Sequence, residues 1–171
     1  LTFEQFWQET LQYLGVLQSK GIKPNDELII LTTSNKRFLV SFWASILGGI
    51  IPVPLAPGIS DEHKSKLFHV ADHLNHPSLV TDNDILERLT KFIKNRNISD
   101  SKSLLTSHCI TTDDSQLNGK VLQRNLNDIA FIQYSSGSTT APKGIVLSHK
   151  NLTSNIYSIA KKLNFTKHDS V

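Results

Sequence analysis

The sequence predicts an α/β fold, with a layered parallel or mixed sheet and flanking helices. Two observations predict this class. Segments with apolar residues at spacings of three and four alternate with short, nearly continuous apolar runs, as helices and strands do around a parallel sheet. The chain has 171 residues, of which 39% are hydrophobic and 19% charged, so it is globular in composition and long enough to bury a core.

The first predicted helix and strand have the clearest patterns. Residues 1–21 carry apolar side chains on one face at the helical period and end at Gly21, a residue suited to terminating a helix. That face consists of Phe3, Phe6, Trp7, Leu11, Leu14 and Leu17. After a turn, ELIILTT at 27–33 predicts a strand, and its nearly unbroken apolar run indicates burial on both faces of the sheet.

A second helix and a proline-containing strand follow. Residues 35–49 predict a helix that is capped by Ser34 or Asn35 and ends at two glycines. Apolar residues surround most of this helix, so we expect it to be largely buried. IIPVPLAPG at 50–58 predicts a short strand, and because proline has no N–H to donate, this strand is expected at an edge or an end of the sheet.

The rest of the chain continues the alternation after one weakly patterned region. The clear elements are a helix at 60–76 capped by Ser60, a strand at 78–82, a helix at 83–96, strands at 128–136 and 144–149, and a helix at 150–165. In that last helix the apolar residues Leu152, Ile156, Ile159 and Leu163 share one face. Residues 98–127 allow one strand within 101–114 and an exposed loop at 114–127.

The stretch YSSGSTTAPKG, at 134–144, separates the two last strands and is too long for a tight turn. Its composition suits a polyphosphate, which is bound by backbone N–H groups, hydroxyl donors and a cation. The candidate hydroxyl donors are Ser135, Ser136, Ser138, Thr139 and Thr140. Gly137 gives the backbone freedom, Pro142 stiffens it, Lys143 supplies positive charge and Gly144 leads into the next strand. The P-loop motif of kinases is excluded, since proline precedes the lysine and a strand follows.

This stretch resembles the phosphate-loop signature of the adenylate-forming, or AMP-binding, enzymes, in which a Ser/Thr/Gly-rich segment ends in Pro-Lys-Gly. Thr140 departs from the pattern, because family members usually have glycine there, so the loop is expected to be stiffer. Residues 1–31, FWASILGGIIPVPLAPG at 42–58 and LSHKNLTSN at 147–155 are similar to further family segments, whereas 82–127 match loosely. The sequence FIQYSSGST, together with SHKNLTSNI, is most similar to fatty acyl-AMP ligases.

The resemblance implies that residues 1–171 are a partial N-terminal adenylation domain, without its remainder and without a C-terminal lid domain. It implies that ATP and Mg²⁺ activate a carboxylic acid, with a fatty acid as the first candidate. The acyl group would then be transferred to the phosphopantetheine thiol of a carrier protein or to CoA. By resemblance Ser135, Ser136, Gly137, Ser138, Thr139, Thr140, Lys143 and Gly144 bind the phosphates, and Lys143 is catalytic. The metal ligand is expected outside these residues, and the fragment alone is expected to be inactive.

Alternatives to a fatty acyl-AMP ligase stay open on the sequence. An amino-acid adenylation domain of a nonribosomal peptide synthetase and an acyl-CoA ligase share the same signature. A non-catalytic nucleotide-binding or docking module is the alternative from another class of function, and Thr140 is the feature that favours it.

Composition weighs against several other classes. The net charge is +3 and the pI about 9.0, but the basic residues are scattered, so no nucleic-acid partner is expected. No run approaches the roughly 18 apolar residues of a membrane span. The single cysteine, Cys109, fits a reducing, cytoplasmic compartment and is expected to be a small buried apolar residue. The chain starts at Leu1 and has no methionine, so we expect it to be a piece of a longer protein.

Other polar residues are given structural roles. His69, His73 and His76 share one helical face away from the apolar stripe, so we expect a solvated surface and no metal site. His149 follows the loop closely, and either a place beside the site or a packing role is open. The aspartates in turn-like contexts are expected to cap helices and turns and not to catalyse. They are Asp82, Asp84, Asp113 and Asp114.

Overall fold

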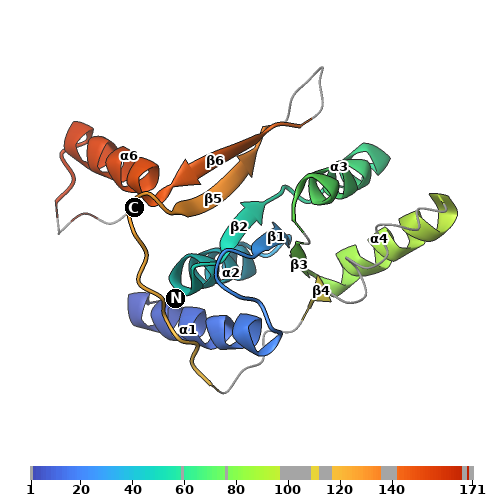
Figure 1. The fold of residues 1–171 in the computed structure, drawn as a ribbon, viewed down its shortest axis with the longest axis horizontal. Coiled ribbons are helices and arrows are strands. Elements are labelled where there is room, and N and C mark those ends of the chain that lie inside the picture. The colour runs from blue at the N-terminus through green and yellow to red at the C-terminus, as the bar shows by residue number, and fades with distance from the viewer. Residues whose placement is uncertain are drawn as a thin grey trace.

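A four-stranded parallel sheet forms the centre of the structure, which is a computed structural model that describes residues 2–58, 60–75, 77–96, 109–111, 117–135, 142–166 and 169. Its strands lie in the order β2-β1-β3-β4 (Figure 1). They are β1 (Glu27–Leu31), β2 (Ile51–Pro54), β3 (Ser78–Thr81) and β4 (Cys109–Ile110). The α/β class is confirmed. The edge position of β2 is confirmed as well, and it suits a strand with two prolines that donate no hydrogen bond.

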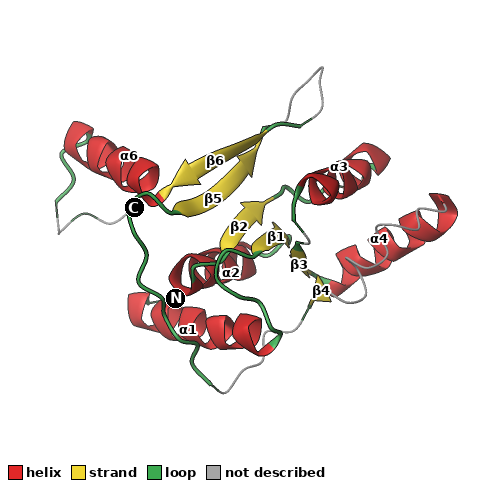
Figure 2. Cartoon of the chain, in the orientation of Figure 1, coloured by secondary structure: helices red, strands yellow, loops and turns green. Residues whose placement is uncertain are grey.

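Helices cover both faces of this sheet, as Figure 2 shows. The helices are α1 (Phe3–Ser19), α2 (Asn35–Gly48), α3 (Asp61–His73) and α4 (Asn83–Arg96). Alternate residues of β1 point to opposite faces of the sheet. Leu28 and Ile30 pack with α1 and α2. Ile29 and Leu31 pack with α3 and α4. The burial of β1 on both faces is therefore confirmed.

The helix ends follow the capping residues of the sequence. The side chains of Ser34 and Ser60 accept hydrogen bonds from the backbone N–H three residues on and cap α2 and α3. Thr2 and Gln5 form a reciprocal capping box at the start of α1. Gly49 ends α2 in the left-handed conformation, with φ of 68°, which glycine adopts without steric cost.

The expectation of a largely buried α2 is only partly correct. One side of the helix packs through Val40 and Ala44 into the core. The adjacent side, about 100° round the helix, leaves Leu39 46% and Trp43 37% exposed. An all-round apolar helix needs neighbours on every side, and α1 and the sheet cover only part of its circumference.

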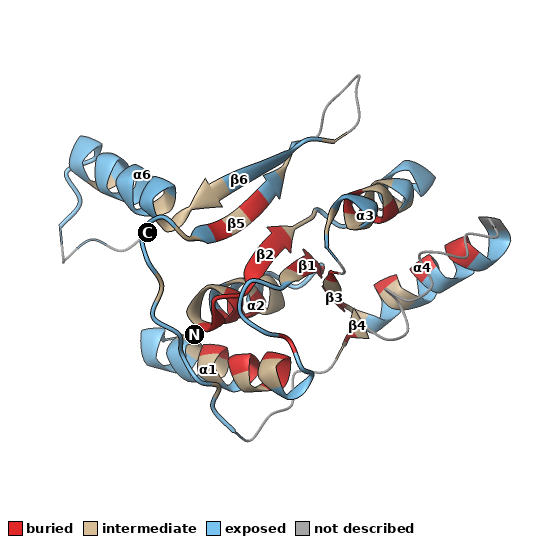
Figure 3. Cartoon of the chain, in the orientation of Figure 1, coloured by how far each residue is buried: buried red, intermediate tan, exposed pale blue. Residues whose placement is uncertain are grey.

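The last elements form a separate antiparallel hairpin and a helix. Strand β5 (Ile129–Tyr134) pairs with β6 (Gly144–Ser148), and α6 (His149–Lys162) follows directly. The hairpin lies beside β2, and Ile132 of β5 joins the core on the α3 and α4 side. Figure 3 shows that β6 and α6 are much more exposed than the central sheet. The predicted apolar face of α6 exists, but no residue of that helix is buried.

The weakly patterned region is anchored to the first two helices where the structure describes it. The predicted strand within 101–114 is confirmed as the short β4. Residues 117–127 form the exposed loop that was expected, with no regular element. This loop is held by hydrogen bonds from Gly119 N to Leu11 O, at 2.7 Å, and from Leu122 N to Leu47 O, at 2.8 Å.

The thiol of Cys109 is expected to react slowly with alkylating reagents. Its side chain packs against the core beside α3 and α4, and burial raises its pKa to about 11, with Arg37 acting weakly in the opposite direction. At pH 8 only about one thiol in a thousand is then ionised, so we expect iodoacetamide to react on the order of a hundredfold more slowly than with an exposed cysteine. Mass spectrometry of the native and the urea-unfolded protein measures this ratio, and equal rates would contradict the prediction.

Candidate phosphate-binding site

The hydroxyl-rich stretch connects the two antiparallel strands of the hairpin. Tyr134 is the last residue of β5 and lies opposite Gly144, the first residue of β6. The Ser135 N–H donates to the carbonyl oxygen of Lys143 at 3.1 Å, which closes the base of the loop. Five of the predicted site residues lie outside the described residues, namely Ser136, Gly137, Ser138, Thr139 and Thr140. The structure therefore places the two ends of the loop and brings Ser135 next to Lys143.

Tyr134 anchors this base to the core. Its ring is half-buried and packs against the core cluster that contains Ile132 and Val53. Burial, and secondarily the negative charge of Glu27, raise the pKa of Tyr134, so its hydroxyl stays protonated at neutral pH. The loop thus starts from a fixed, uncharged residue.

Gly144 is required by this same tyrosine. A Cβ atom at position 144 would lie 3.0 Å from Cζ and 3.2 Å from the hydroxyl oxygen of Tyr134. These distances are shorter than ordinary van der Waals contacts. The glycine therefore lets the Tyr134 ring cover the backbone where the loop ends. This contact explains the glycine at position 144 more specifically than its place before the next strand does.

Lys143 is the cation at the base of the loop. Its side chain is exposed, and no ion pair joins it to a carboxylate among the residues that the structure describes. An ammonium group without a carboxylate neighbour at the mouth of a serine- and threonine-rich loop suits a polyanion. The residues present at the base of the loop, Ser135 and Lys143, therefore fit the phosphates of a nucleotide.

His149 lies at the opposite end of β6 from the described base of the loop. It follows β6 and is the first residue of α6, and its backbone N–H donates to the carbonyl oxygen of Asp128 at 3.0 Å. The five residues of β6, at about 3.4 Å per residue, put it roughly 17 Å from the loop. The extended β6 thus separates His149 from the described base of the loop, and a place beside the site stays a prediction.

A comparison with known protein families shows to which family this chain belongs. The model of the AMP-binding enzyme family matches residues 1–171. The chain belongs to the AMP-binding enzyme family. The resemblance inferred from the loop is thereby confirmed, and the relatives of this AMP-binding chain are ligases.

Two curated relatives are fatty-acid ligases by name. Long-chain-fatty-acid–AMP ligase FadD32 of Mycobacterium marinum is 28% identical over 156 residues, which are 91% of this chain and 25% of that protein. Putative fatty-acid–CoA ligase fadD25 of Mycobacterium tuberculosis is 26% identical over 160 residues, which are 93% of this chain and 27% of that protein. The AMP-binding chain thus spans about a quarter of the length of these relatives.

Solved structures of the family have the same fold. McyG A-PCP complexed with phenylalanyl-adenylate matches with a TM-score of 0.86 and 25% identity, over 99% of this chain and 31% of that one. The fatty acyl-adenylate ligase from L. pneumophila, in complex with acyl adenylate and pyrophosphate, matches with a TM-score of 0.80 and 26% identity, over 97% and 28%. The α/β architecture of the AMP-binding chain is therefore that of adenylate-forming enzymes.

Most of the described polar residues away from the loop have the surroundings that the sequence predicted. His73 is exposed, and its Nδ1 lies 2.6 Å from the carbonyl oxygen of His69. His69 is half-buried, so the expectation of a solvated face is only partly correct. Within the described ranges, no three histidine, cysteine or acidic side chains come together in a way that would hold a metal ion. His76, Asp113 and Asp114 lie outside these ranges.

Asp82 belongs to a network that the sequence did not predict. Its carboxylate accepts from Thr32 Oγ1 at 2.7 Å and from Thr33 N at 2.8 Å, and it pairs with Arg37 Nη1 at 3.1 Å. Arg37 also donates to the carbonyl oxygens of Thr81 and Thr111. Burial alone would raise the pKa of Asp82, but the hydrogen bonds from Thr33, Thr32 and Arg37 together hold it below its ordinary value. The network joins the carboxyl ends of β1, β3 and β4, so Asp82 holds the sheet end together through these contacts where a helix or turn cap was expected.

None of the helices in the described part of the AMP-binding chain combines the length and apolar composition of a bilayer-spanning segment.

Proposed function

We propose that the protein containing this chain activates a fatty acid with ATP as an acyl-adenylate, and transfers the acyl group to the phosphopantetheine thiol of a carrier protein. The observation that carries this proposal is the family loop between β5 and β6, with the exposed Lys143 at its base. The names of the two ligase relatives support a fatty acid as the substrate.

The loop residues would act on the phosphates that leave. In the proposed first step a carboxylate oxygen bonds to the α-phosphorus of ATP, and the bond to the departing pyrophosphate breaks. Negative charge then grows on the β- and γ-phosphates, and donors already aimed at that charge lower the barrier. Lys143, Ser135 and the hydroxyls and backbone of 136–140 are the groups of this chain that would hold it, with Gly144 keeping the loop base in place.

ATP supplies the phosphoanhydride whose cleavage drives the activation, and Mg²⁺ would share the phosphate charge. We propose that the magnesium ligand lies outside residues 1–171. We also propose a cytoplasmic location, which the single cysteine of the chain supports.

The test is pyrophosphate release by the full-length protein with ATP and a panel of fatty acids and amino acids. Release with a fatty acid, followed by acylation of a carrier protein in preference to CoA, is the expected result. Release with an amino acid would favour the second candidate, an amino-acid adenylation domain, to which the similarity with the phenylalanyl-adenylate complex points. Preference for CoA would favour the acyl-CoA ligase, in line with the fadD25 name. Nucleotide binding without any turnover would leave the non-catalytic module.

We further propose that residues 1–171 are part of a larger N-terminal adenylation domain and are inactive alone. The curated relatives are about four times as long. In the described residues, β6, α6 and the C-cap of α6 present apolar side chains to solvent, including Ile145, Ile156, Ile159 and the C-cap residue Leu163. An exposed apolar face of this kind marks a surface that another part of a protein covers.

Replacing Ile156 by aspartate should therefore destabilise the full-length protein. Ile156 is 52% exposed in this chain, and if the rest of the domain covers it, a carboxylate there is buried without a partner. We expect the midpoint of thermal unfolding to fall by roughly 5–10 °C. Ser154→Asp is the matched control, because Ser154 lies on the opposite side of the same helix. Equal, small shifts for both variants would show that nothing packs on this face.

A further inference from the structure

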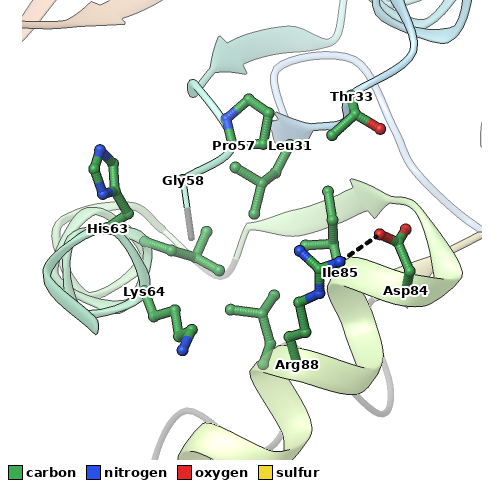
Figure 4. A pocket seen from close by; sticks show the side chains of 11 residues that line it. Leu31, Thr33, Pro57, Gly58, His63, Lys64, Asp84, Ile85 and Arg88 are labelled. Carbon is green, nitrogen blue, oxygen red and sulfur yellow. Dashed lines mark ion pairs between the residues drawn. The ribbon is translucent and has the colours of Figure 1, made fainter. Parts of the chain in front are cut away.

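A second candidate site lies on the far side of β1 from α1 and α2. A cavity of about 270 Å³ opens between α3 and α4, where β1 and β2 end (Figure 4). Leu31 closes β1, Pro57 follows β2, and Ile85 lies in the first turn of α4. None of the described residues at the ends of the phosphate loop lines this cavity. Its lining is therefore distinct from the described base of the candidate phosphate-binding site.

The sheet topology favours a ligand at this position. The strand order β2-β1-β3-β4 means that the chain leaves β1 toward one side and later returns to β3 on its other side. In open α/β sheets, ligands bind outside the carboxyl ends of the strands at such a change of direction. Leu31 and Thr33 of the cavity wall follow the end of β1, and Asp84 and Ile85 follow the end of β3. The cavity thus lies where the fold leaves room for a ligand.

The interior of the cavity is mostly apolar. Its walls include Leu31, Leu67, Ile85 and Leu89. All four are buried members of the core cluster on this side of the sheet, so they are held in place by packing. Such walls accept a hydrocarbon or aromatic body and give no hydrogen bond to a polar one.

Two cations stand at the rim, and each has one carboxylate partner. Figure 4 shows Lys64 of α3 and Arg88 of α4 at the cavity, with Asp84 beside Arg88. The Arg88 Nη2–Asp84 Oδ2 distance is 3.4 Å, longer than a well-formed charge-assisted hydrogen bond of about 2.8 Å. Both side chains are exposed, so this pair is weak and an anion can compete for the guanidinium.

Lys64 is held at the rim more firmly. Its Nζ lies 2.9 Å from Asp61 Oδ1 and 5.3 Å from the centre of the Phe92 ring, and its side chain is only 19% exposed. The ammonium group is thus fixed over the apolar wall by two neighbours. Lys64 thus offers an anion an ammonium group that is already ordered, with its charge partly offset by the exposed carboxylate of Asp61.

We propose that this cavity binds a small organic carboxylate, with its apolar body against Leu67 and Leu89 and its carboxylate on Arg88 and Lys64. The apolar walls select against inorganic anions, and the rim selects against neutral hydrocarbons. This site shares no described residue with the phosphate loop, so the proposal of a carboxylate site does not rest on the proposed acyl activation.

The test uses 4-fluorobenzoate as the probe and the full-length protein, with ¹⁹F NMR titration as the readout of binding. We expect saturable binding to the wild type, about tenfold weaker binding to Arg88→Gln, and several-fold tighter binding to Asp84→Asn. The opposite signs matter, since a variant that merely loosens the fold weakens binding in both cases. Lys64→Gln should weaken binding in the same direction as Arg88→Gln.

Lys91→Gln is the matched control. Lys91 is on the same helix as Arg88 and pairs with Glu87 at 2.6 Å, but it does not line the cavity. We expect its affinity for 4-fluorobenzoate to equal that of the wild type. Absence of saturable binding by the wild type up to about 10 mM probe would overturn the proposal. So would equal losses in Arg88→Gln and Lys91→Gln, or weaker binding in Asp84→Asn. Because the readout is binding and not turnover, failure here is distinct from failure of the proposed enzyme activity.

Discussion

Lys143→Ala in the full-length protein is expected to lower kcat for acyl-adenylate formation by roughly 10²–10³-fold, while KM for the acid changes little. Lys143 is the cation at the base of the phosphate loop, and its side chain has no carboxylate partner among the described residues. Its charge is therefore available to the phosphates. The acid itself would be bound elsewhere, so its affinity should hardly depend on this lysine. Pyrophosphate release over a range of acid concentrations separates the two constants.

Lys150→Ala provides the control for this variant. Lys150 lies in the first turn of α6, beyond the end of β6, where a cation gains nothing from the helix dipole. Its loss should leave kcat within about twofold of the wild type. Unchanged adenylation in Lys143→Ala would remove the lysine from the site. A rise in KM alone would mean that the lysine binds the ground state and contributes nothing specific to the transition state.

The fold was predictable where a local pattern had a single physical solution. The unbroken apolar run of β1 needs cover on both faces, and the prolines of β2 exclude a central position. Ser34, Ser60 and Gly49 end or begin helices through hydrogen bonds within a few residues. Each of these predictions depends on neighbours in sequence and so needs no knowledge of the tertiary structure.

Predictions failed where a distant part of the chain decides. One side of α2, with Leu39 and Trp43, is apolar by composition, but the described residues cover it only in part. His149 is close to the loop in sequence, yet an extended strand carries it to the other end of the hairpin. An extended strand lengthens by about 3.4 Å per residue, so closeness in sequence across β6 does not bring a residue close to the loop.

The same distinction between local and distant determinants applies to the candidate site. The loop was recognisable because its chemistry is contained in consecutive residues. The reason for Gly144 was not, since it depends on the Tyr134 ring across the hairpin. The pairing of Arg37 with Asp82 joins residues 45 positions apart, and the one local signal for it was an aspartate directly after a buried strand. The cavity between α3 and α4 likewise depends on helices brought together by the sheet.

Arg37→Met should separate β4 from the sheet more often than in the wild type. Arg37 donates to Asp82 and to the carbonyl oxygens of Thr81 and Thr111, and the pair is well covered, with side-chain exposures of 13% and 17%. Breaking such a pair leaves a buried carboxylate with less compensation and costs about 3 kcal/mol. That corresponds to roughly a hundredfold more frequent opening of β4. Alkylation of Cys109, the first residue of β4, measures the opening in native conditions.

The direction of this change separates opening from a simple charge effect. Arg37 favours the Cys109 thiolate, so its removal alone raises the pKa of the thiol and slows alkylation. Faster alkylation in Arg37→Met can therefore come only from exposure of the strand. Lys36→Met is the matched control, because Lys36 is the preceding residue and forms an exposed pair with Glu9 at 2.8 Å. We expect it to change the rate less than about fivefold.

The same network should make the chain sensitive to acid through Asp82. Its hydrogen bonds hold the pKa of Asp82 below the ordinary value in the folded protein. A depressed carboxyl pKa adds stability above the unfolded value of about 3.9, and that stability is lost as pH falls through the folded pKa. The difference in unfolding free energy between the wild type and Asp82→Asn should therefore be full at pH 7 and shrink below about pH 4. If the difference in unfolding free energy stayed constant across this range, the asparagine would destabilise the fold through its shape alone. The charge of the Asp82 carboxylate would then contribute nothing to stability.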